Sequence, residues 1–309
     1  MTINVLFAAR EGSWPNYEAP LNAAFEDLGL KVDLARTHAP KDVDYIVYAP
    51  NAPLQDFTPF HRAKAVLNLW AGVDAIVRNP TLNLPLARMV DPGMTTSMTE
   101  WVAGHVMRYH LGIDRYVVNP NQNWAPHVPP LASERQIAIL GMGALGSAVA
   151  EMLMRLGFHV TGWSRRPKDS SIPMHHGADG LRAALSCADM VVLLLPDTPA
   201  TANTLNPETL AWLPKGAFVI NPGRGPLIDD QALIAALDDG HIAGATLDVF
   251  RTEPLPQEHP FWAHPKVTVT PHVAAETRPI TAARVIAENV RRGEAGEPFL
   301  HLVDRDSGY

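Results

Sequence analysis

The chain has 309 residues, a length that favours two domains over one compact core. Hydrophobic residues make up 47% and charged residues 18%, which is typical of a folded globular protein and argues against a disordered chain. A formal net charge of −7 argues against nucleic acid or an anionic membrane surface as a partner, so small molecules are the expected ligands.

Cysteine content and the first residues predict the cellular compartment. The single cysteine, Cys187, leaves no internal disulfide or thiolate metal cluster and is expected to be a buried structural thiol. The first residues lack the basic start and long apolar core of a signal peptide, and no uncharged run reaches the roughly 20 residues of a membrane-spanning helix. We therefore expect a cytoplasmic protein without a membrane segment.

Short apolar runs alternate with stretches of helical periodicity from the start of the chain. Residues 3–8, 45–48 and 66–69 are predicted strands, and residues 17–28 are a predicted helix. Such alternation is typical of a parallel α/β sheet. Residues 97–118 contain no proline and predict one long connecting helix, which a proline-rich loop follows.

The alternation resumes after residue 136 and predicts a second, longer α/β unit. Its expected strands cover residues 137–140, 159–163, 190–195, 218–221, 244–249 and 267–270. A last helix is expected over residues 279–292, with its end at Gly293. The remaining tail has too little apolar periodicity for a domain and is expected to pack against the first domain.

The sharpest motif is a glycine-rich turn after the predicted strand 137–140, Gly141-Met142-Gly143-Ala144-Leu145-Gly146. Apolar residues then recur at helical spacing, so a strand, a turn and an amphipathic helix follow one another. Gly141 permits the tight turn, Gly143 lets the backbone approach a pyrophosphate, and Gly146 allows close helix packing. The start of the helix, with Ala144 and Leu145, supplies amide donors and positive potential. We interpret the motif as a dinucleotide-binding turn; the alternative is a purely structural turn.

The second predicted strand of this unit ends in a basic segment, Trp163-Ser164-Arg165-Arg166-Pro167-Lys168. An NAD-selective site would carry Asp or Glu about 20 residues after the glycines to bind the ribose 2′-hydroxyl. Ser164, Arg165 and Lys168 suit a 2′-phosphate instead, and Arg166 adds to the positive charge. We therefore expect NADPH to be the preferred cofactor and NADH to be a weaker alternative cofactor. The alternative is a solvated basic loop.

Three ionisable side chains follow predicted strands of the second domain. Arg224 follows strand 218–221, Glu253 follows strand 244–249 and His272 follows strand 267–270. Ligands of doubly wound sheets bind at the carboxyl ends of the strands, so these side chains are expected to meet at one edge. An arginine holds a carboxylate with two hydrogen bonds, and a histidine oriented by a glutamate protonates a carbonyl oxygen as hydride reaches the carbon. The set suits reduction of a 2-oxo acid; the alternative is a group of ion pairs that hold loops in place.

The sequence resembles the D-isomer-specific 2-hydroxyacid dehydrogenases over most of its length. The resemblance rests on the order and combination of residues 140–146, 195–196, 221–225, 247–256 and 270–274. Residues 70–74, 163–165, 272–279 and 308–309 are most like the members of that family that reduce glyoxylate and hydroxypyruvate. The family implies two doubly wound parallel-sheet domains. Residues 1–97 with 286–309 would form a flavodoxin-like substrate domain, and residues 98–285 a Rossmann domain that binds NAD(P).

The resemblance also implies roles for the residues at the strand ends. Arg224 would anchor the substrate carboxylate, His272 would act as acid and base, and Glu253 would be the partner of His272. Asp248 would meet the nicotinamide carboxamide. The family commonly has a small residue where Pro222 stands, and this proline would tilt the Arg224 turn.

Further implied positions complete the site. The backbone amides of Gly72 and Val73 would bind the substrate carboxylate from the first domain, so that substrate lies between the domains. Leu195 and Pro196 would contact the cofactor. Arg278 is expected to contact substrate or close the cleft, with helix capping or solvation as the alternative.

Together these patterns predict an NADPH-dependent oxidoreductase that reduces glyoxylate to glycolate and hydroxypyruvate to D-glycerate by hydride transfer, without a metal. A homodimer follows from the resemblance alone. One alternative is a dehydrogenase for a bulkier 2-oxo acid such as phenylpyruvate, because the pocket depends on loops. Another is a non-catalytic protein that senses nicotinamide cofactors, although the presence of Arg224, Glu253 and His272 argues against it.

Overall fold

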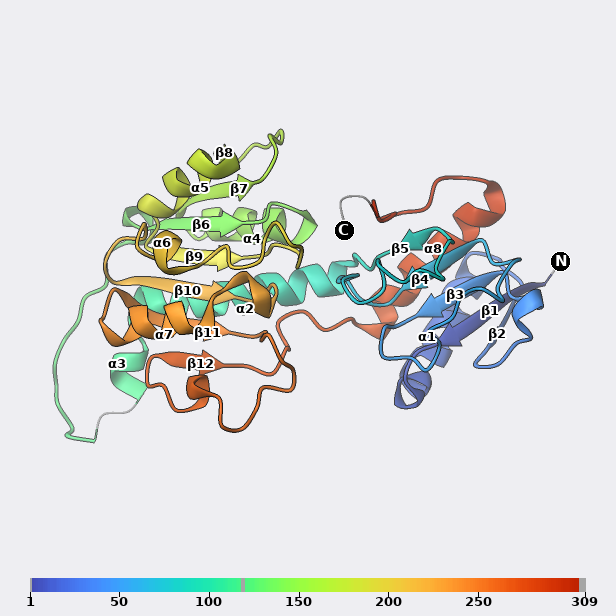
Figure 1. The fold of residues 1–309 in the computed structure, drawn as a ribbon, viewed down its shortest axis with the longest axis horizontal. Helices are drawn as coiled ribbons and strands as arrows, with labels where there is room; N and C mark the ends of the chain where they lie inside the picture. Colours follow the sequence, from blue (N-terminus) through green and yellow to red (C-terminus); the bar gives the residue numbers. More distant parts are fainter. Residues whose placement is uncertain (1, 118–119, 306–309) are drawn as a thin grey trace. The chain divides into compact units, whose positions relative to one another are not determined.

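The computed structural model describes residues 2–117 and 120–305 and separates them into two compact units (Figure 1). One unit comprises Met1–Met94 and Thr277–Tyr309, and the other comprises Thr95–Glu276. Residues 308–309, which form part of the family resemblance, lie outside the described residues. Among the residues that the structure describes, no helix has both the length and the apolar character needed to cross a membrane.

The first unit is built on a five-stranded parallel sheet in the order β2-β1-β3-β4-β5. Its strands are β1 (Ile3–Ala8), β2 (Val32–Ala35), β3 (Tyr45–Tyr48), β4 (Ala65–Asn68) and β5 (Leu86–Ala87). This is the flavodoxin-like order, so the predicted fold of this domain is confirmed. Sequence patterns missed β2, which is only partly buried, and β5, which has two residues.

Two long helices belong to this unit, α1 (Trp14–Asp27) and α8 (Pro279–Ala295), and they pack against each other. The Tyr45 hydroxyl of β3 donates to Glu294 of α8 at 2.8 Å. A Cβ atom at Gly293 would overlap that hydroxyl, so this glycine allows the helix to approach the sheet. The predicted helix end at Gly293 is therefore wrong: α8 continues to Ala295 and ends at Gly296, whose φ of 71° is left-handed.

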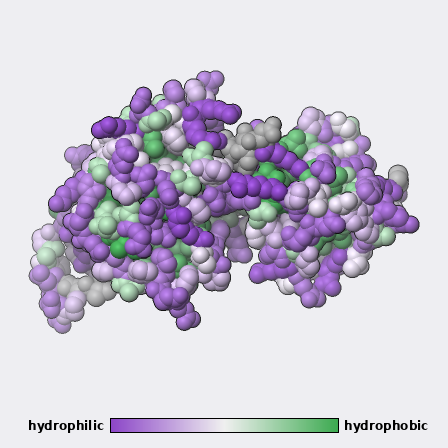
Figure 2. Space-filling view, in the orientation of Figure 1, coloured by the Kyte–Doolittle hydropathy of each residue, from purple (hydrophilic) through white to green (hydrophobic). Residues whose placement is uncertain are grey.

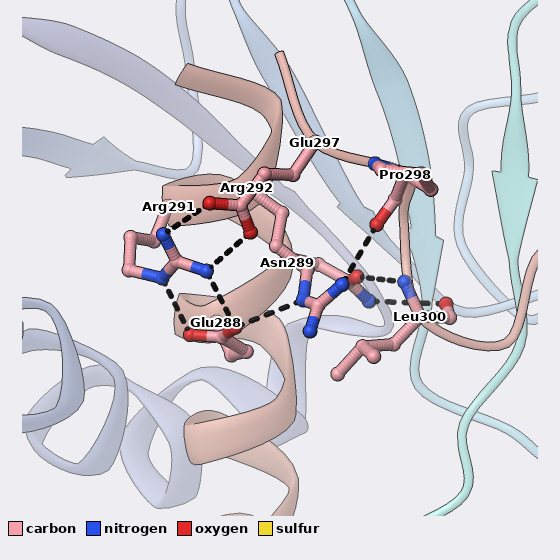
Figure 3. A network of polar contacts seen from close by, with 7 residues as sticks. All are labelled: Glu288, Asn289, Arg291, Arg292, Glu297, Pro298 and Leu300. Atoms are coloured by element: carbon pink, nitrogen blue, oxygen red, sulfur yellow. Dashed lines mark hydrogen bonds and ion pairs between the residues drawn. The ribbon is translucent and has the colours of Figure 1, made fainter. Parts of the chain in front are cut away.

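The tail after α8 returns to the edge of the sheet at β5. The Arg88 amide donates to the His301 carbonyl at 3.0 Å, and the Val303 amide donates to the Leu86 carbonyl at 2.8 Å. Figure 3 shows how the start of the tail is tied to α8 by arginine–glutamate ion pairs and by side-chain hydrogen bonds, which join Glu288, Asn289, Arg291, Arg292, Glu297, Pro298 and Leu300.

The second unit is built on a seven-stranded parallel sheet in the order β12-β11-β10-β9-β6-β7-β8. Counted within the unit, this order is 7-6-5-4-1-2-3, the Rossmann arrangement with one added strand, as predicted. Its strands are β6 (Gln136–Leu140), β7 (His159–Ser164), β8 (Met174–His176), β9 (Met190–Leu193), β10 (Ala217–Asn221), β11 (Ile242–Leu247) and β12 (Val267–Val269). Its main helices are α4 (Ala144–Arg155), α5 (Gly177–Ser186), α6 (Pro207–Leu210) and α7 (Asp230–Asp238).

Helices cover both faces of this sheet, and the alternation of side chains along β6 shows how. Ile137 and Ile139 join a buried cluster with α4 and with α2 (Pro92–Leu111). Ala138 and Leu140 join a second buried cluster with α5 and α7. A strand that is apolar on both faces belongs in a parallel sheet, because helices must cover both sides. Figure 2 shows that hydrophilic side chains cover most of the face of each unit in that view.

Two predictions for local structure are wrong. The helix expected over residues 97–118 is broken, because Gly112 adopts a φ of 64° between α2 and α3 (Asp114–Val117). Residue 118 lies outside the described part of the chain. Cys187 is exposed rather than buried, because it follows the end of α5, where Ala184 and Leu185 already fill the core-facing positions.

The predicted domain boundaries at 97/98 and 285/286 differ from the ends of the compact units. Residue 285 lies inside α8, which as a whole helix belongs to the first unit. The first boundary lies within α2. The assignment of substrate and cofactor binding to the two domains stays a prediction.

Candidate active site

The carboxyl ends of three neighbouring strands place the ionisable residues of the second unit. Asn221 of β10 pairs with Leu247 of β11, and Leu247 pairs with Val269 of β12, so the strands end level with one another. The segments that follow carry Arg224, Glu253 and His272. The sheet register therefore brings together the side chains that sequence analysis singled out.

Glu253 and His272 form a close pair at this edge. Nδ1 of His272 lies 2.7 Å from Oε2 of Glu253, and the Phe250 amide donates to Oε1 of Glu253 at 2.9 Å. The His272 side chain is 52% exposed, and the structure shows no hydrogen bond from its Nε2 to another described residue. Because one ring nitrogen is held by the carboxylate, the other is left to face a ligand.

The electrostatics of this pair favour an ionised glutamate. Partial burial raises the pKa of Glu253, but hydrogen bonds from His272 and the Phe250 amide and the positive charges of His272 and Arg224 outweigh it. The pKa of Glu253 therefore lies below its ordinary value. Arg224 thus adds to the positive potential that favours the ionised carboxylate.

Asp248 holds the backbone on both sides of His272. Its Oδ1 accepts from the Thr270 hydroxyl at 2.5 Å and from the Val273 amide at 2.9 Å, and its Oδ2 accepts from the Ala274 amide at 2.9 Å. Asp248 is completely buried, and its carbonyl accepts from the His272 amide at 2.9 Å. His272 has a φ of 55°, an uncommon value for a residue with a side chain. These hydrogen bonds maintain that conformation and aim the imidazole.

The turn that carries Arg224 is held by its neighbours. The Asn221 side chain donates to the Arg224 carbonyl at 2.9 Å and accepts from the Gly223 amide at 3.1 Å. A Cβ atom at Gly225 would overlap the backbone of Phe250, so only glycine lets this turn pack against the segment that bears Glu253. The structure thus couples the Arg224 turn to the Glu253 loop.

The glycine turn at the start of α4 has the features of a phosphate site. Cβ atoms at Gly141 and Gly146 would overlap the carbonyl oxygens of Leu194 and Gly141, so packing within the chain requires glycine at both positions. A Cβ atom at Gly143 would meet no described atom within 4 Å. Gly143 precedes Ala144 and Leu145 at the helix start, and no side chain caps their amides. The space over Gly143 fits the close approach of a pyrophosphate.

The basic segment after β7 lies beside this turn. The Lys168 ammonium donates to the Met142 carbonyl between the glycines, and the Ser164 hydroxyl donates to the Arg166 carbonyl at 2.7 Å. Arg166 and Lys168 are exposed. Three basic side chains therefore lie where the second strand ends, as the site of a 2′-phosphate requires.

Sequence analysis missed a pocket of about 350 Å³ next to Arg165. Its wall comes from the end of β7, from the start of α5 and from residues 200–209, and it includes Trp163, Leu181, Asn203 and Thr209. The loop before it follows Leu195 and Pro196, and it is tightened by the Thr201 hydroxyl, which donates to the Pro196 carbonyl at 2.6 Å.

The predicted substrate residues of the first unit lie in two places. Gly72 and Val73 follow β4 in an irregular loop, and the Val73 side chain is buried in the core. Arg278 is the residue before α8, with Pro279 at the first helical position. Arg278 occupies the N-cap position of α8, but its side chain makes no capping hydrogen bond and has another interaction within the protein. Its predicted contact with substrate stays a prediction.

Comparison with known proteins agrees with this geometry. Residues 104–274 match the family model described as "D-isomer specific 2-hydroxyacid dehydrogenase, NAD binding domain". The chain belongs to the D-isomer specific 2-hydroxyacid dehydrogenase family. The glyoxylate/hydroxypyruvate reductase A of Serratia proteamaculans is 43% identical over 80% of this dehydrogenase and 82% of the relative. The protein of the same name from Salmonella typhi is 42% identical over the same shares.

Solved structures show the same likeness over the whole dehydrogenase. A D-isomer specific 2-hydroxyacid dehydrogenase from Xanthobacter autotrophicus, in complex with NADPH and MES, is 41% identical with a TM-score of 0.93 and covers 100% of both chains. An NADPH-dependent glyoxylate/hydroxypyruvate reductase from Sinorhizobium meliloti, in complex with NADP and sulfate, is 34% identical with a TM-score of 0.86 and covers 100% of this chain and 99% of that one.

Proposed function

We propose that this dehydrogenase reduces glyoxylate to glycolate and hydroxypyruvate to D-glycerate with NADPH. The observation that carries the proposal is the His272–Glu253 pair at 2.7 Å, within electrostatic range of Arg224 and on the same sheet edge as the glycine turn. Two curated relatives that bear the name glyoxylate/hydroxypyruvate reductase A, at 42–43% identity, support the substrate class.

Arg224, His272 and Glu253 have different roles in the reduction of a 2-oxo acid. A bound nicotinamide cofactor supplies the hydride. Arg224 holds the substrate carboxylate, because a guanidinium offers two parallel donors to two oxygens. Nε2 of His272 gives its proton to the carbonyl oxygen as that oxygen gains negative charge. Glu253 keeps the ring in position through Nδ1 and stabilises its positive charge before the proton leaves.

The preference for NADPH rests on the basic segment. Ser164, Arg165 and Lys168 lie at and just after the end of β7, where a ribose 2′-phosphate would bind, and this segment carries no carboxylate before Asp169, which is exposed beyond the strand end. Two related structures contain NADPH or NADP. We assign the pocket beside Arg165 to the adenosine end of the cofactor, because it adjoins the 2′-phosphate site at the end of the second strand.

A homodimer is also proposed. The segment after α3 carries apolar side chains that the chain itself leaves uncovered: Trp124 is 95% exposed, Val128 87% and Leu131 70%. Such a row of exposed apolar side chains is typical of a protein interface. The measured mass in solution should be twice that of one chain, and Trp124→Asp should shift it toward the monomer. The cytoplasmic location expected from the sequence stays a prediction.

The decisive experiment follows the absorbance of NADPH with purified protein. Glyoxylate, hydroxypyruvate, pyruvate and phenylpyruvate are compared, with NADH in parallel and His272→Ala as the inactive control. Fast turnover of the first two, which the control loses while still binding NADPH, supports the proposal. Preference for phenylpyruvate would assign the enzyme to bulkier substrates, and cofactor binding without any turnover would favour the sensing function.

A further inference from the structure

Asn68, the last residue of β4, makes hydrogen bonds that the reaction proposed above does not use. It is 1% exposed, and its Nδ2 donates to the Trp70 carbonyl at 2.8 Å and to the Gly72 carbonyl at 3.1 Å. Its Oδ1 is buried and has no partner among the described residues. If the Asn68 amide were reversed, its oxygen would face the Trp70 and Gly72 carbonyl oxygens, which cannot donate to it. The two carbonyls therefore determine which end of the amide carries the nitrogen.

These two hydrogen bonds orient the peptide groups in the loop after β4: Asn68 alone holds the Gly72 carbonyl, and it shares the Trp70 carbonyl with the Met89 amide, which donates to it at 3.0 Å. In a trans peptide the carbonyl of one residue points opposite to the amide of the next. Because the Gly72 carbonyl points toward Asn68, the Val73 amide points away from it. The Trp70 carbonyl turns the Ala71 amide away in the same manner. The Val73 side chain, packed in the core, holds the far end of the loop.

The amides of Ala71 and Val73, which point away from Asn68, and the Gly72 amide between them have no partner among the described residues. Among the described residues, the structure shows no hydrogen bond donated by the amides of Ala71, Gly72 or Val73. Successive backbone amides that converge without partners form a concavity that binds anions. A buried acceptor without a partner reduces stability, so packing alone does not account for Asn68 at this position.

We infer that Asn68 is a positioning residue that holds the amides of this loop toward the carboxylate of the substrate. The inference rests on the proposed function, in which the Gly72 and Val73 amides implied by the family resemblance would join Arg224 in holding the substrate carboxylate, and it adds the residue that orients these amides. Asn68 suits the task because its side chain has two donors on one nitrogen, one for each carbonyl.

The test compares two variants with a matched control. Asn68→Ala removes both donors, and Asn68→Asp keeps the shape but places an acceptor against two carbonyls. Asn289→Ala is the control, because Asn289 is also 1% exposed in the first unit and also braces backbone, through Leu300 (Figure 3). Each purified variant is assayed with glyoxylate and with glycolaldehyde, which lacks the carboxylate, and its affinity for NADPH is measured.

We expect both Asn68 variants to raise the KM for glyoxylate roughly 10- to 100-fold, the effect of misplacing a hydrogen bond to a charged group, with a much smaller change in kcat. The kcat/KM for glycolaldehyde and the affinity for NADPH should stay at wild-type values. Asn289→Ala should lower the melting temperature and leave the KM unchanged. An unchanged KM in the Asn68 variants, or equal losses for both substrates, would overturn the inference.

A second measurement covers the case in which the Asn68 variants do not fold. In the wild-type enzyme with NADP bound, oxalate should shift the amide resonances of Val73 and Ala71, observed by selective 15N labelling, and unperturbed resonances would overturn the inference. Failure of the proposed function looks different. It appears as wild-type protein that turns over neither glyoxylate nor hydroxypyruvate, whatever the variants do.

Discussion

The carboxylate of Asp248 offers the sharpest test of how the fold positions His272. Three donors converge on it: the Thr270 hydroxyl and the amides of Val273 and Ala274. In Asp248→Asn the remaining side-chain oxygen still accepts hydrogen bonds, but the new NH2 group is itself a donor and lies against an N–H or O–H that needs an acceptor. At least one backbone amide then loses its partner, and the side chain keeps its shape.

The expected cost follows from these contacts. One unsatisfied buried donor costs about 1–3 kcal/mol, and each remaining hydrogen bond weakens by roughly 1 kcal/mol when its acceptor loses its charge. Removing a buried charge offsets part of this loss, so we expect about 2–4 kcal/mol less stability. For a unit of this size the melting temperature should fall by roughly 5–15 °C. Because the backbone at His272 is then free to leave its φ of 55°, kcat should fall more than about 10-fold.

Thermal unfolding and steady-state kinetics on Asp248→Asn measure both effects, with Thr270→Val as the matched control. That control removes one of the three donors and should cost only about 1 kcal/mol. If Asp248→Asn melts within about 2 °C of wild type and keeps its kcat, the carboxylate does not hold the His272 backbone, and the reasoning is wrong.

Three further predictions test the other parts of the site. Gly143→Ala should keep its free energy of unfolding within about 0.5 kcal/mol of wild type, because no described atom meets the added Cβ, yet bind NADPH at least about 10-fold more weakly. Gly146→Ala should instead lower the free energy of unfolding by about 1–3 kcal/mol, because the added Cβ overlaps a carbonyl oxygen. Equal stability of the two variants would contradict the packing argument. Arg165→Ala should raise the KM for NADPH with little change for NADH, and an equal effect on both would exclude 2′-phosphate recognition. Because hydrogen bonds and nearby positive charge outweigh burial and lower the pKa of Glu253, the pair stabilises the fold above the ordinary glutamate pKa of about 4.3 and loses this as the pH falls further. Glu253→Gln should therefore show a smaller loss of stability in acid than wild type, and parallel curves for the two proteins would contradict this.

The sequence predicted the parts of the site that have local signals. The glycine turn lies between a strand and a helix, and the strands before Arg224 and His272 are short apolar runs, so topology alone brings their ends to one edge. The pocket beside Arg165 escaped detection because its wall combines side chains such as Leu181 and Asn203, which have no distinctive chemistry and meet only in the folded chain.

The role of a glycine can also depend on contacts that form only in the folded chain. A glycine after apolar helical periodicity normally signals a helix end, yet Gly293 lies inside α8, because Tyr45 passes too close for any side chain there. Asp248 is a further case, because the donors that occupy its carboxylate lie in residues 270–274 and follow a different strand. Tertiary contacts of this kind determine residue identity without leaving a periodic pattern.

The second unit, Thr95–Glu276, is one continuous segment inserted into the first, whose two segments lie on either side of it in the chain. This has a consequence for synthesis on the ribosome. The inserted unit has all its strands before α8 emerges, so it can fold on its own while the chain grows. The first unit cannot be completed until α8 and the tail that pairs with β5 have been made. We therefore expect the segment that follows Glu276 to complete the unit that the segment before Thr95 begins, and a chain stalled between the two to carry a folded second unit attached to an unfinished first one.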